Sequence, residues 1–144
     1  FTVDELTFPG LGDTAIGTFH TNYWSPDLPF PQNKKFVADF EKKYGYTPSN
    51  FSAQAYDMPL FLDSGIRAVK GNLNDKNGIR AALRKADYPS TRGPYKYNIN
   101  HMPIQNYYKR EVIRGEDGKP KAVVRGTVFK DHKDAYFKDC KMKW

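Results

Sequence analysis

A proline-rich segment constrains the fold of this chain more than any other feature. Residues 25–33 read SPDLPFPQN, with three prolines in six positions. Proline fixes φ and has no backbone N–H, so this segment cannot be a helix interior or a central strand. It is predicted to be an extended connector between two parts of different character.

Strand-like residues precede the connector. Residues 15–24, AIGTFHTNYW, alternate apolar with small or polar side chains and are rich in threonine and aromatic residues, which is typical of a pleated strand. Phe1 and Val3 indicate a first strand that ends in a Pro9-Gly10 turn. Because the chain begins within this pattern, without a methionine or the apolar region of a signal peptide, we expect a cut inside a larger protein.

A helix is predicted directly after the connector. Asn33 is its expected N-cap, and Gly45 is its expected C-terminal stop. Between them, apolar residues fall at helical spacing: Phe36, Val37, Phe40 and Tyr44.

Two further helices are predicted before residue 87. Ser49 or Asn50 caps the first of them, which ends at Gly71 and contains a kink at Pro59. Asp75 caps the second, KNGIRAALRKA. The apolar face of the longer helix comprises Ala55, Met58, Leu62, Ile66 and Val69.

Strand patterns return after Pro89. The stretches GPYKYNI, IQNYYKREVIR and KAVVRGTVFK read as strands, and Asp117-Gly118 predicts a hairpin between the last two. The final residues form a short helix or an irregular tail. The predicted order is β-β-α-α-α-β-β-β, a mixed α/β fold that combines pieces of sheet with three helices.

The charge distribution argues against a nucleic-acid partner. The net charge is +7, and residues 101–144 carry 11 lysines and arginines against 6 acids. The two signs are interleaved there, whereas a nucleic-acid face concentrates its lysines and arginines in a stripe. We interpret the excess as a solvated basic surface, and a basic nucleic-acid-binding module is kept as an alternative.

The sequence contains no pattern that predicts catalysis, a metal site or a cofactor. Cys140 is the only cysteine, so it is a free thiol or pairs outside this chain. His20, His101 and His132 belong to no metal-binding motif. Serine-nucleophile and phosphate-loop motifs are absent, and Asp57 is predicted to make a helix-cap or interhelix hydrogen bond. The prediction is binding rather than an enzyme.

Aromatic side chains offer the best candidates for ligand contact. Tyr56 and Gln54 lie near a predicted helix N-terminus, where free N–H groups and the helix dipole favour an anion. This position favours Tyr56 as a ligand contact. The remaining tyrosines in residues 95–108 are interpreted as sheet packing.

Three motifs together resemble one family. PSNFSAQAYD, RGPYKYNINHMPIQNYYKREV and HKDAYFKDCKM are similar to the C-terminal half of type I periplasmic solute-binding proteins of ABC importers. Within that family, the chain looks most like the receptors for branched-chain amino acids and aromatic acids.

The resemblance implies pieces of two α/β lobes that close over a solute. Residues 1–22 would be a segment of the C-terminal lobe with a hinge strand, residues 23–103 the helical segment of the N-terminal lobe, and residues 104–144 strands and tail of the C-terminal lobe. The connector would be the second crossing between lobes, and residues 92–112 the third.

The resemblance also implies a ligand and partners. Tyr56 matches an aromatic position against the ligand, and Phe1 and Thr2 fall near a loop that faces the cleft. Phe1 stands where amino-acid receptors place an acid for the ligand's ammonium, which favours an aromatic or other apolar carboxylate. The implied partners are an inner-membrane ABC permease and either the N-terminal half of the receptor or a second copy of the chain, in the periplasm or another extracytoplasmic compartment. A ligand-sensing domain of a signalling receptor is the alternative.

Overall fold

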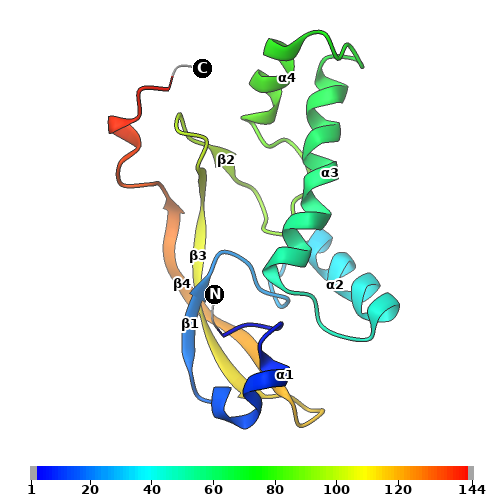
Figure 1. Cartoon of the computed structure of the whole chain (residues 1–144), viewed down its shortest axis with the longest axis vertical. Coiled ribbons are helices and arrows are strands. Elements are labelled where there is room, and N and C mark those ends of the chain that lie inside the picture. Colours follow the sequence, from blue (N-terminus) through cyan, green and yellow to red (C-terminus); the bar gives the residue numbers. More distant parts are fainter. Residues whose placement is uncertain (1–2, 143–144) are drawn as a thin grey trace.

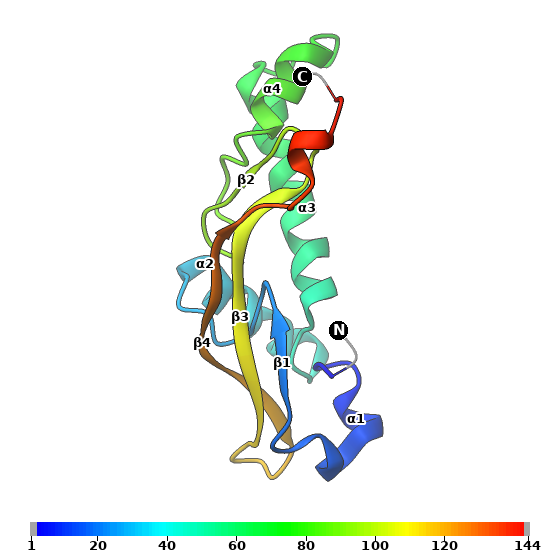
Figure 2. The ribbon, with the colours of Figure 1, turned by 90° about the vertical axis from the view of Figure 1, so that its left-hand side faces the viewer.

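A long β-hairpin runs along one side of the molecule (Figure 1). Helices lie beside its middle and upper parts, and one short helix lies at its lower end (Figures 1 and 2). The computed structural model describes residues 3–142, so Phe1 and Thr2 lie outside the described residues. Its elements are α1 (Phe8–Leu11), η1 (Gly12–Ala15), β1 (Phe19–Asn22), α2 (Pro31–Tyr44), α3 (Asn50–Ala68), α4 (Lys76–Leu83), β2 (Lys96–Tyr97), β3 (Pro103–Arg114), β4 (Pro120–His132) and η2 (Phe137–Asp139).

Strand β3 is the centre of the sheet. It pairs antiparallel with β1, where Phe19 lies opposite Glu111, and with β4 along most of its length. The short β2 pairs with the first residues of β3. The loop between β3 and β4 places Gly118 at φ +79°, a conformation that glycine adopts without strain. The predicted Asp117-Gly118 hairpin is confirmed.

The predicted N-terminal strand and turn are wrong where they fall on described residues. Val3 lies in a bend, and Pro9-Gly10 lies inside α1. The carbonyl of Asp4 accepts the N–H groups of both Thr7 and Phe8, which starts a helical turn. Proline is well tolerated in the first turn of a helix because its missing N–H has no intrahelical partner there.

Asn33 is not the N-cap that the sequence predicts. Helix α2 already begins at Pro31, and Asn33 is fully buried on it. Its amide nitrogen donates to the carbonyls of Ser25, Pro26 and Leu28, and its oxygen accepts the indole N–H of Trp24 at 2.7 Å. The side chain therefore fixes the proline-rich connector instead of the helix end.

The other predicted caps agree with the structure. Gly45 ends α2 at φ +77°, and Ser49 accepts the N–H of Ser52 at the start of α3. Asp75 accepts the N–H of Gly78 at the start of α4. Helix α3 continues through Pro59 and ends at Ala68, and Gly71 with φ +79° follows.

Two buried clusters lie at different levels of the hairpin. The first joins the connector, α2, α3 and β3, and comprises Tyr23, Trp24, Leu28, Phe36, Ala53 and Tyr108. The second joins α1, η1 and the hairpin, and comprises Phe8, Ala15, Val112 and Ala122. Strand β3 contributes to both, so it links the two ends of the molecule.

The apolar face predicted for α3 exists, but it is not covered. Met58 is 59% exposed, Leu62 47% and Ile66 38%, and Phe51 at the N-terminal end of the same face is also exposed. We call Phe51, Met58, Leu62 and Ile66 the α3 stripe. The opposite side of α3, with Ala53 and Asp57, is the buried side.

The C-terminal tail returns to the end of the molecule that holds α4 and β2 (Figures 1 and 2). Asn100, in the turn between β2 and β3, donates to Asp134 at 2.6 Å. The tail contains only the short η2 and is otherwise irregular in its described part, as predicted.

Candidate functional site

The two predicted crossing segments lie against each other and against the start of α3. Asn22, at the end of β1, is paired with Tyr108 of β3. The rings of Tyr23 and Tyr107 meet edge to face at 6.5 Å, and Asn50 of α3 donates to the Tyr23 hydroxyl at 3.4 Å. Any movement between the sheet and the helices must act on this junction.

A buried carboxylate holds α3 to the segment that leads into β2. Asp57 is 2% exposed, and it accepts the Ser90 hydroxyl at 2.5 Å and the Thr91 N–H at 3.0 Å. The Arg92 guanidinium lies 3.9 Å from it. The sequence predicted a helix cap or an interhelix hydrogen bond for Asp57, whereas its partners lie on the loop after α4.

Arg92 connects both crossing segments. Its guanidinium lies over the ring of Tyr23 at 5.2 Å and over the ring of Tyr95 at 4.2 Å. It also donates to Gln105 of β3 at 2.9 Å. Planar stacking with a directed hydrogen bond is a geometry that arginine provides and lysine does not. We call Asp57, Arg92 and these partners the junction network.

Tyrosine hydroxyls extend the network. Those of Tyr88 and Tyr95 lie 2.7 Å apart, and Tyr88 also donates to Asp57 at 3.5 Å. Burial raises the pKa of both hydroxyls above the usual range, so both remain protonated and act as neutral hydrogen-bond donors at physiological pH.

A second buried charge pair lies below the junction. Arg110 of β3 is 0% exposed and pairs with Glu5, which follows the segment containing Phe1 and Thr2. Burial raises the pKa of Glu5, and Arg110 opposes that shift. Burial, together with the nearby Arg110 charge, lowers the pKa of His20 on β1 to about 4. His20 is therefore neutral at pH 7.

The structure separates the two described site residues that the sequence predicts. The Tyr56 ring packs on Phe36 at 4.7 Å, and its hydroxyl accepts from Gln32 of α2 at 2.9 Å. Gln54 is exposed. Two positions along a helix correspond to about 200° of rotation, so these side chains point in different directions. Phe1 and Thr2 lie outside the described residues.

Sequence reasoning missed Arg92 and gave Asp57 only a minor role. The available signal was an acid within an apolar helical stretch, which requires a partner when it is buried. The partner could not be found from spacing, because Asp57 and Arg92 are distant in the sequence and meet only through the fold.

Metal binding and membrane insertion find no support in the described residues. No group of three or more histidine, cysteine, aspartate or glutamate side chains is arranged to hold a metal ion in residues 3–142. Within the same range, no helix has the length and apolar character to cross a membrane.

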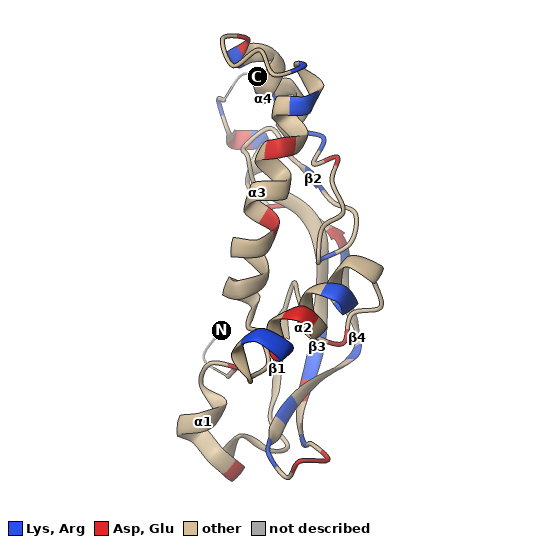
Figure 3. Cartoon of the chain, turned by 90° about the vertical axis from the view of Figure 1, so that its right-hand side faces the viewer, with Lys and Arg blue, Asp and Glu red and all other residues tan. Residues whose placement is uncertain are grey.

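Lysines and arginines are distributed over α2, α4 and the hairpin, with acids among them (Figure 3).

Comparison with known proteins identifies the family. The profile of the periplasmic binding protein family matches residues 1–119. The Leu/Ile/Val-binding protein homolog 6 of Brucella abortus is 30% identical over 118 residues, which are 79% of this chain and 30% of that protein. The chain therefore spans about a third of the length of this curated relative.

Solved structures show the same likeness. An ABC-transporter solute-binding protein from R. palustris, in complex with benzoate, has a TM-score of 0.84 and 32% identity over 99% of this chain and 38% of its own. A second solute-binding protein of an ABC transporter, from Rhodopseudomonas palustris BisB5 in complex with 3,4-dihydroxybenzoic acid, has a TM-score of 0.80 and a sequence identity of 26%. The match covers 92% of this chain and 36% of that protein's chain.

The fold alone is shared with a more distant structure. The leucine-, isoleucine-, valine-, threonine- and alanine-binding protein of Brucella ovis has a TM-score of 0.78 at 19% identity, over 99% of this chain and 39% of its own. The predicted type I fold is confirmed, and the chain belongs to the periplasmic binding protein family.

Proposed function

We propose that this chain is part of the extracytoplasmic solute-binding protein of an ABC importer, and that its solute is a small aromatic carboxylate. The supporting observation is the match to a benzoate complex over 99% of the chain at 32% identity. Because the chain spans only about a third of such proteins, the activity of the whole receptor, its permease partner and its periplasmic location belong to the proposal.

The mechanism is closure of two lobes about the junction network. Residues 1–22 and 104–144 belong to one lobe and residues 23–103 to the other. A solute bound between the lobes favours the closed state by the difference in its affinity for the two states. The permease recognises the closed shape, and no covalent step is needed.

The proposed ligand contacts come from both lobes. Gln54 and Tyr56 lie in the first two turns of α3, and the positive end of the helix dipole favours an anion near this terminus. Phe1 and Thr2, which lie outside the described residues, are the proposed contacts from the segment assigned to the other lobe. Since Tyr56 is held by Gln32, its contribution is a fixed ring edge rather than a mobile side chain.

The α3 stripe is the proposed contact with the remainder of the receptor. A continuous apolar face on a helix is normally buried. In the proposal, the other half of the receptor covers it, or a second copy of this chain does so when that half is absent.

Intact mass and size in solution, followed by a thermal-shift screen, test the proposal. The screen contains benzoate, 4-hydroxybenzoate, leucine and the neutral analogue benzamide. We expect a larger segment to co-purify, and the benzoates to raise the melting temperature while benzamide does not. Stabilisation by leucine alone would assign the branched-chain class instead, and no stabilisation of the reconstituted receptor by any of the four would contradict the proposed function.

A further inference from the structure

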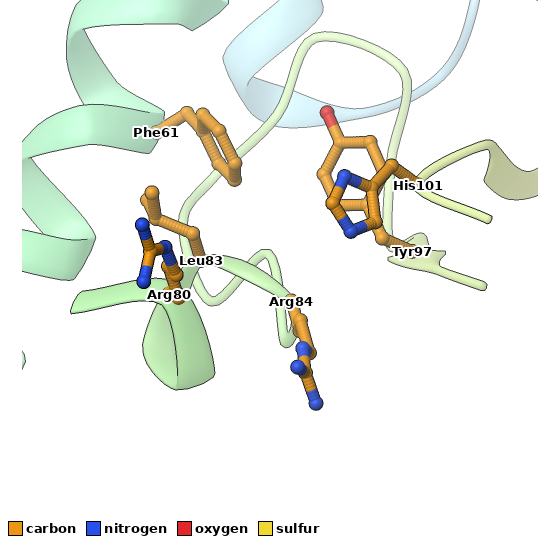
Figure 4. A pocket seen from close by; sticks show the side chains of 6 residues that line it. All are labelled: Phe61, Arg80, Leu83, Arg84, Tyr97 and His101. Atoms are coloured by element: carbon orange, nitrogen blue, oxygen red, sulfur yellow. The ribbon is translucent and has the colours of Figure 1, made fainter. Parts of the chain in front are cut away.

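A hollow lies between α3, α4 and β2, beside Tyr88 and Tyr95 of the junction network. Its volume is about 310 Å³, near the lower end of the range for small-molecule sites. Phe61 of α3 and Leu83 of α4 form one side, and Tyr97 and His101 form the other (Figure 4). Arg80 and Arg84 complete the lining. We call this hollow the distal pocket.

Contacts within the fold hold its walls in place. The N–H of Tyr97 donates to the carbonyl of Arg84 at 3.1 Å, which ties β2 to the end of α4. Helices α3 and α4 approach so closely that a Cβ on Gly65 would lie 2.8 Å from Leu83 Cδ2. The rings of Phe61 and Tyr97 lie 5.5 Å apart.

The turn that supplies His101 is also fixed. Its N–H donates to the Asn98 carbonyl at 3.0 Å, and the Asn98 N–H donates to the Met102 carbonyl at 2.9 Å. His101 has φ +61°, a costly conformation for a residue other than glycine. The backbone therefore sets the position of this wall without any ligand.

The lining combines flat apolar walls with cationic groups. Phe61, Leu83 and Tyr97 provide apolar surface, and Arg80 and Arg84 lie at the edge, where Arg80 also donates to Asn77 at 3.2 Å. None of the six lining residues is an acid. Aromatic faces accept a flat ring, and a guanidinium binds a carboxylate through paired, charge-assisted hydrogen bonds.

We propose that the distal pocket binds a small organic anion with a flat apolar body and one carboxylate, of which benzoate is the simplest probe. The residues that line this site differ from those of the junction network, although the two adjoin: the Phe61 ring lies 5.8 Å from Tyr88, and the Tyr97 ring lies 5.5 Å from Tyr95. Phe61 stands about 100° around the helix from Leu62 and about 60° from Met58, so the pocket borders the α3 stripe. The proposal does not depend on the function proposed for the cleft.

Amide NMR titration of the chain with benzoate tests this directly. We expect saturable shifts at Phe61, Leu83 and Tyr97, and at least about tenfold weaker binding of benzamide, since a charged hydrogen bond is lost. Acetate, which has the charge without the flat body, is expected to produce no saturable shifts at these residues.

Charge-removing variants identify the anion contact. The double variant Arg80→Gln/Arg84→Gln is expected to bind benzoate at least about tenfold more weakly. Arg125→Gln, on β4 and outside the pocket, serves as the matched control for lost positive charge and is expected to keep the affinity.

Three results would overturn the distal pocket as an anion site. In the first, the shifts map only to the junction network or never saturate. In the second, benzamide binds as well as benzoate. In the third, the double variant keeps its affinity, or the Arg125 control loses as much.

Discussion

A single buried carboxylate illustrates how individual residues act in this protein. Asp57 accepts two hydrogen bonds from the loop after α4 and lies near the charge of Arg92. Replacing it with Asn removes the negative charge and turns one acceptor into a donor that faces the Ser90 hydroxyl or the Thr91 N–H. Arg92 would then be a buried cation without its acid.

We therefore expect Asp57→Asn to lower the free energy of unfolding by about 2–4 kcal/mol, measured by urea denaturation. The matched control is Asp63→Asn on the same helix. Its exposed pair with Arg67 contributes less than about 0.5 kcal/mol. Equal losses for the two variants would show that the junction network adds no stability of its own.

His20 gives the stability of the fold a dependence on pH. Its pKa is about 4 in the folded chain and about 6.5 in the unfolded chain, so the unfolded state binds more protons between these values. The stability is fully present above pH 6.5 and decreases as the pH falls towards 4. Because His20 is only partly buried, we expect a loss of about 1–2 kcal/mol rather than the full value of the shift.

The measurement compares wild type with His20→Gln in urea at several pH values. The difference between the two removes, to first order, the contribution of Glu5, whose raised pKa acts in the opposite direction. A difference that stays constant from pH 7 to 4 would contradict this role of His20.

Residue type alone did not decide the role of the asparagine and aspartate side chains. Ser49 and Asp75 cap helices as predicted, because capping depends on a local hydrogen bond that a short motif encodes. Asn33 and Asp57 instead bind backbone groups that the fold brings to them from other segments. Local spacing carries no information about such partners.

At the scale of elements, α3 has two sides with different partners. Its buried side carries Ala53 and Asp57, and its other side is the exposed α3 stripe. The apolar periodicity correctly predicted that a face exists. It could not predict which face is covered within this chain, since the covered side is held by Asp57 through partners that lie in another segment.

Substitution of the α3 stripe tests whether it is a contact surface. Each large apolar side chain contributes about 1.5–3 kcal/mol when it becomes buried. Met58→Ser/Leu62→Ser should therefore weaken association with the other half of the receptor, or self-association, by about two orders of magnitude or more. Because both residues are exposed, the stability of the unassociated chain should change by less than about 0.5 kcal/mol for each substitution.

Analytical ultracentrifugation over a range of concentrations measures this effect. Leu73→Ser is the control, since Leu73 is also exposed but lies outside α3. If the control weakens association as much as the double variant does, the stripe is not the contact.

The hairpin is the element that the sequence predicted best. Alternating residues on both strands and a glycine turn specify it locally. The helical turn at Pro9-Gly10 was missed because the same residues are equally frequent in turns. There the hydrogen bonds to Asp4 decided the outcome.

At the scale of the whole molecule, β3 joins the two buried clusters. Tyr108 belongs to the cluster around Trp24, and Val112, four residues further along β3, belongs to the cluster around Phe8. No other strand contributes a buried residue to both clusters among the described residues. Loss of either cluster must therefore disturb the strand that supports the other, and the chain is expected to unfold in one cooperative step.

Val112→Ala tests this coupling. Val112 is 0% exposed, so its truncation should cost about 2 kcal/mol. Trp24, also 0% exposed, reports on the distant cluster, and a Trp144→Phe background leaves it as the only tryptophan. We expect the Trp24 fluorescence midpoint in urea to fall together with the circular-dichroism midpoint, whereas the exposed Val128→Ala control leaves both in place. If Val112→Ala moves only the circular-dichroism transition, the two ends unfold separately, and β3 does not transmit stability between the parts that we assign to different lobes.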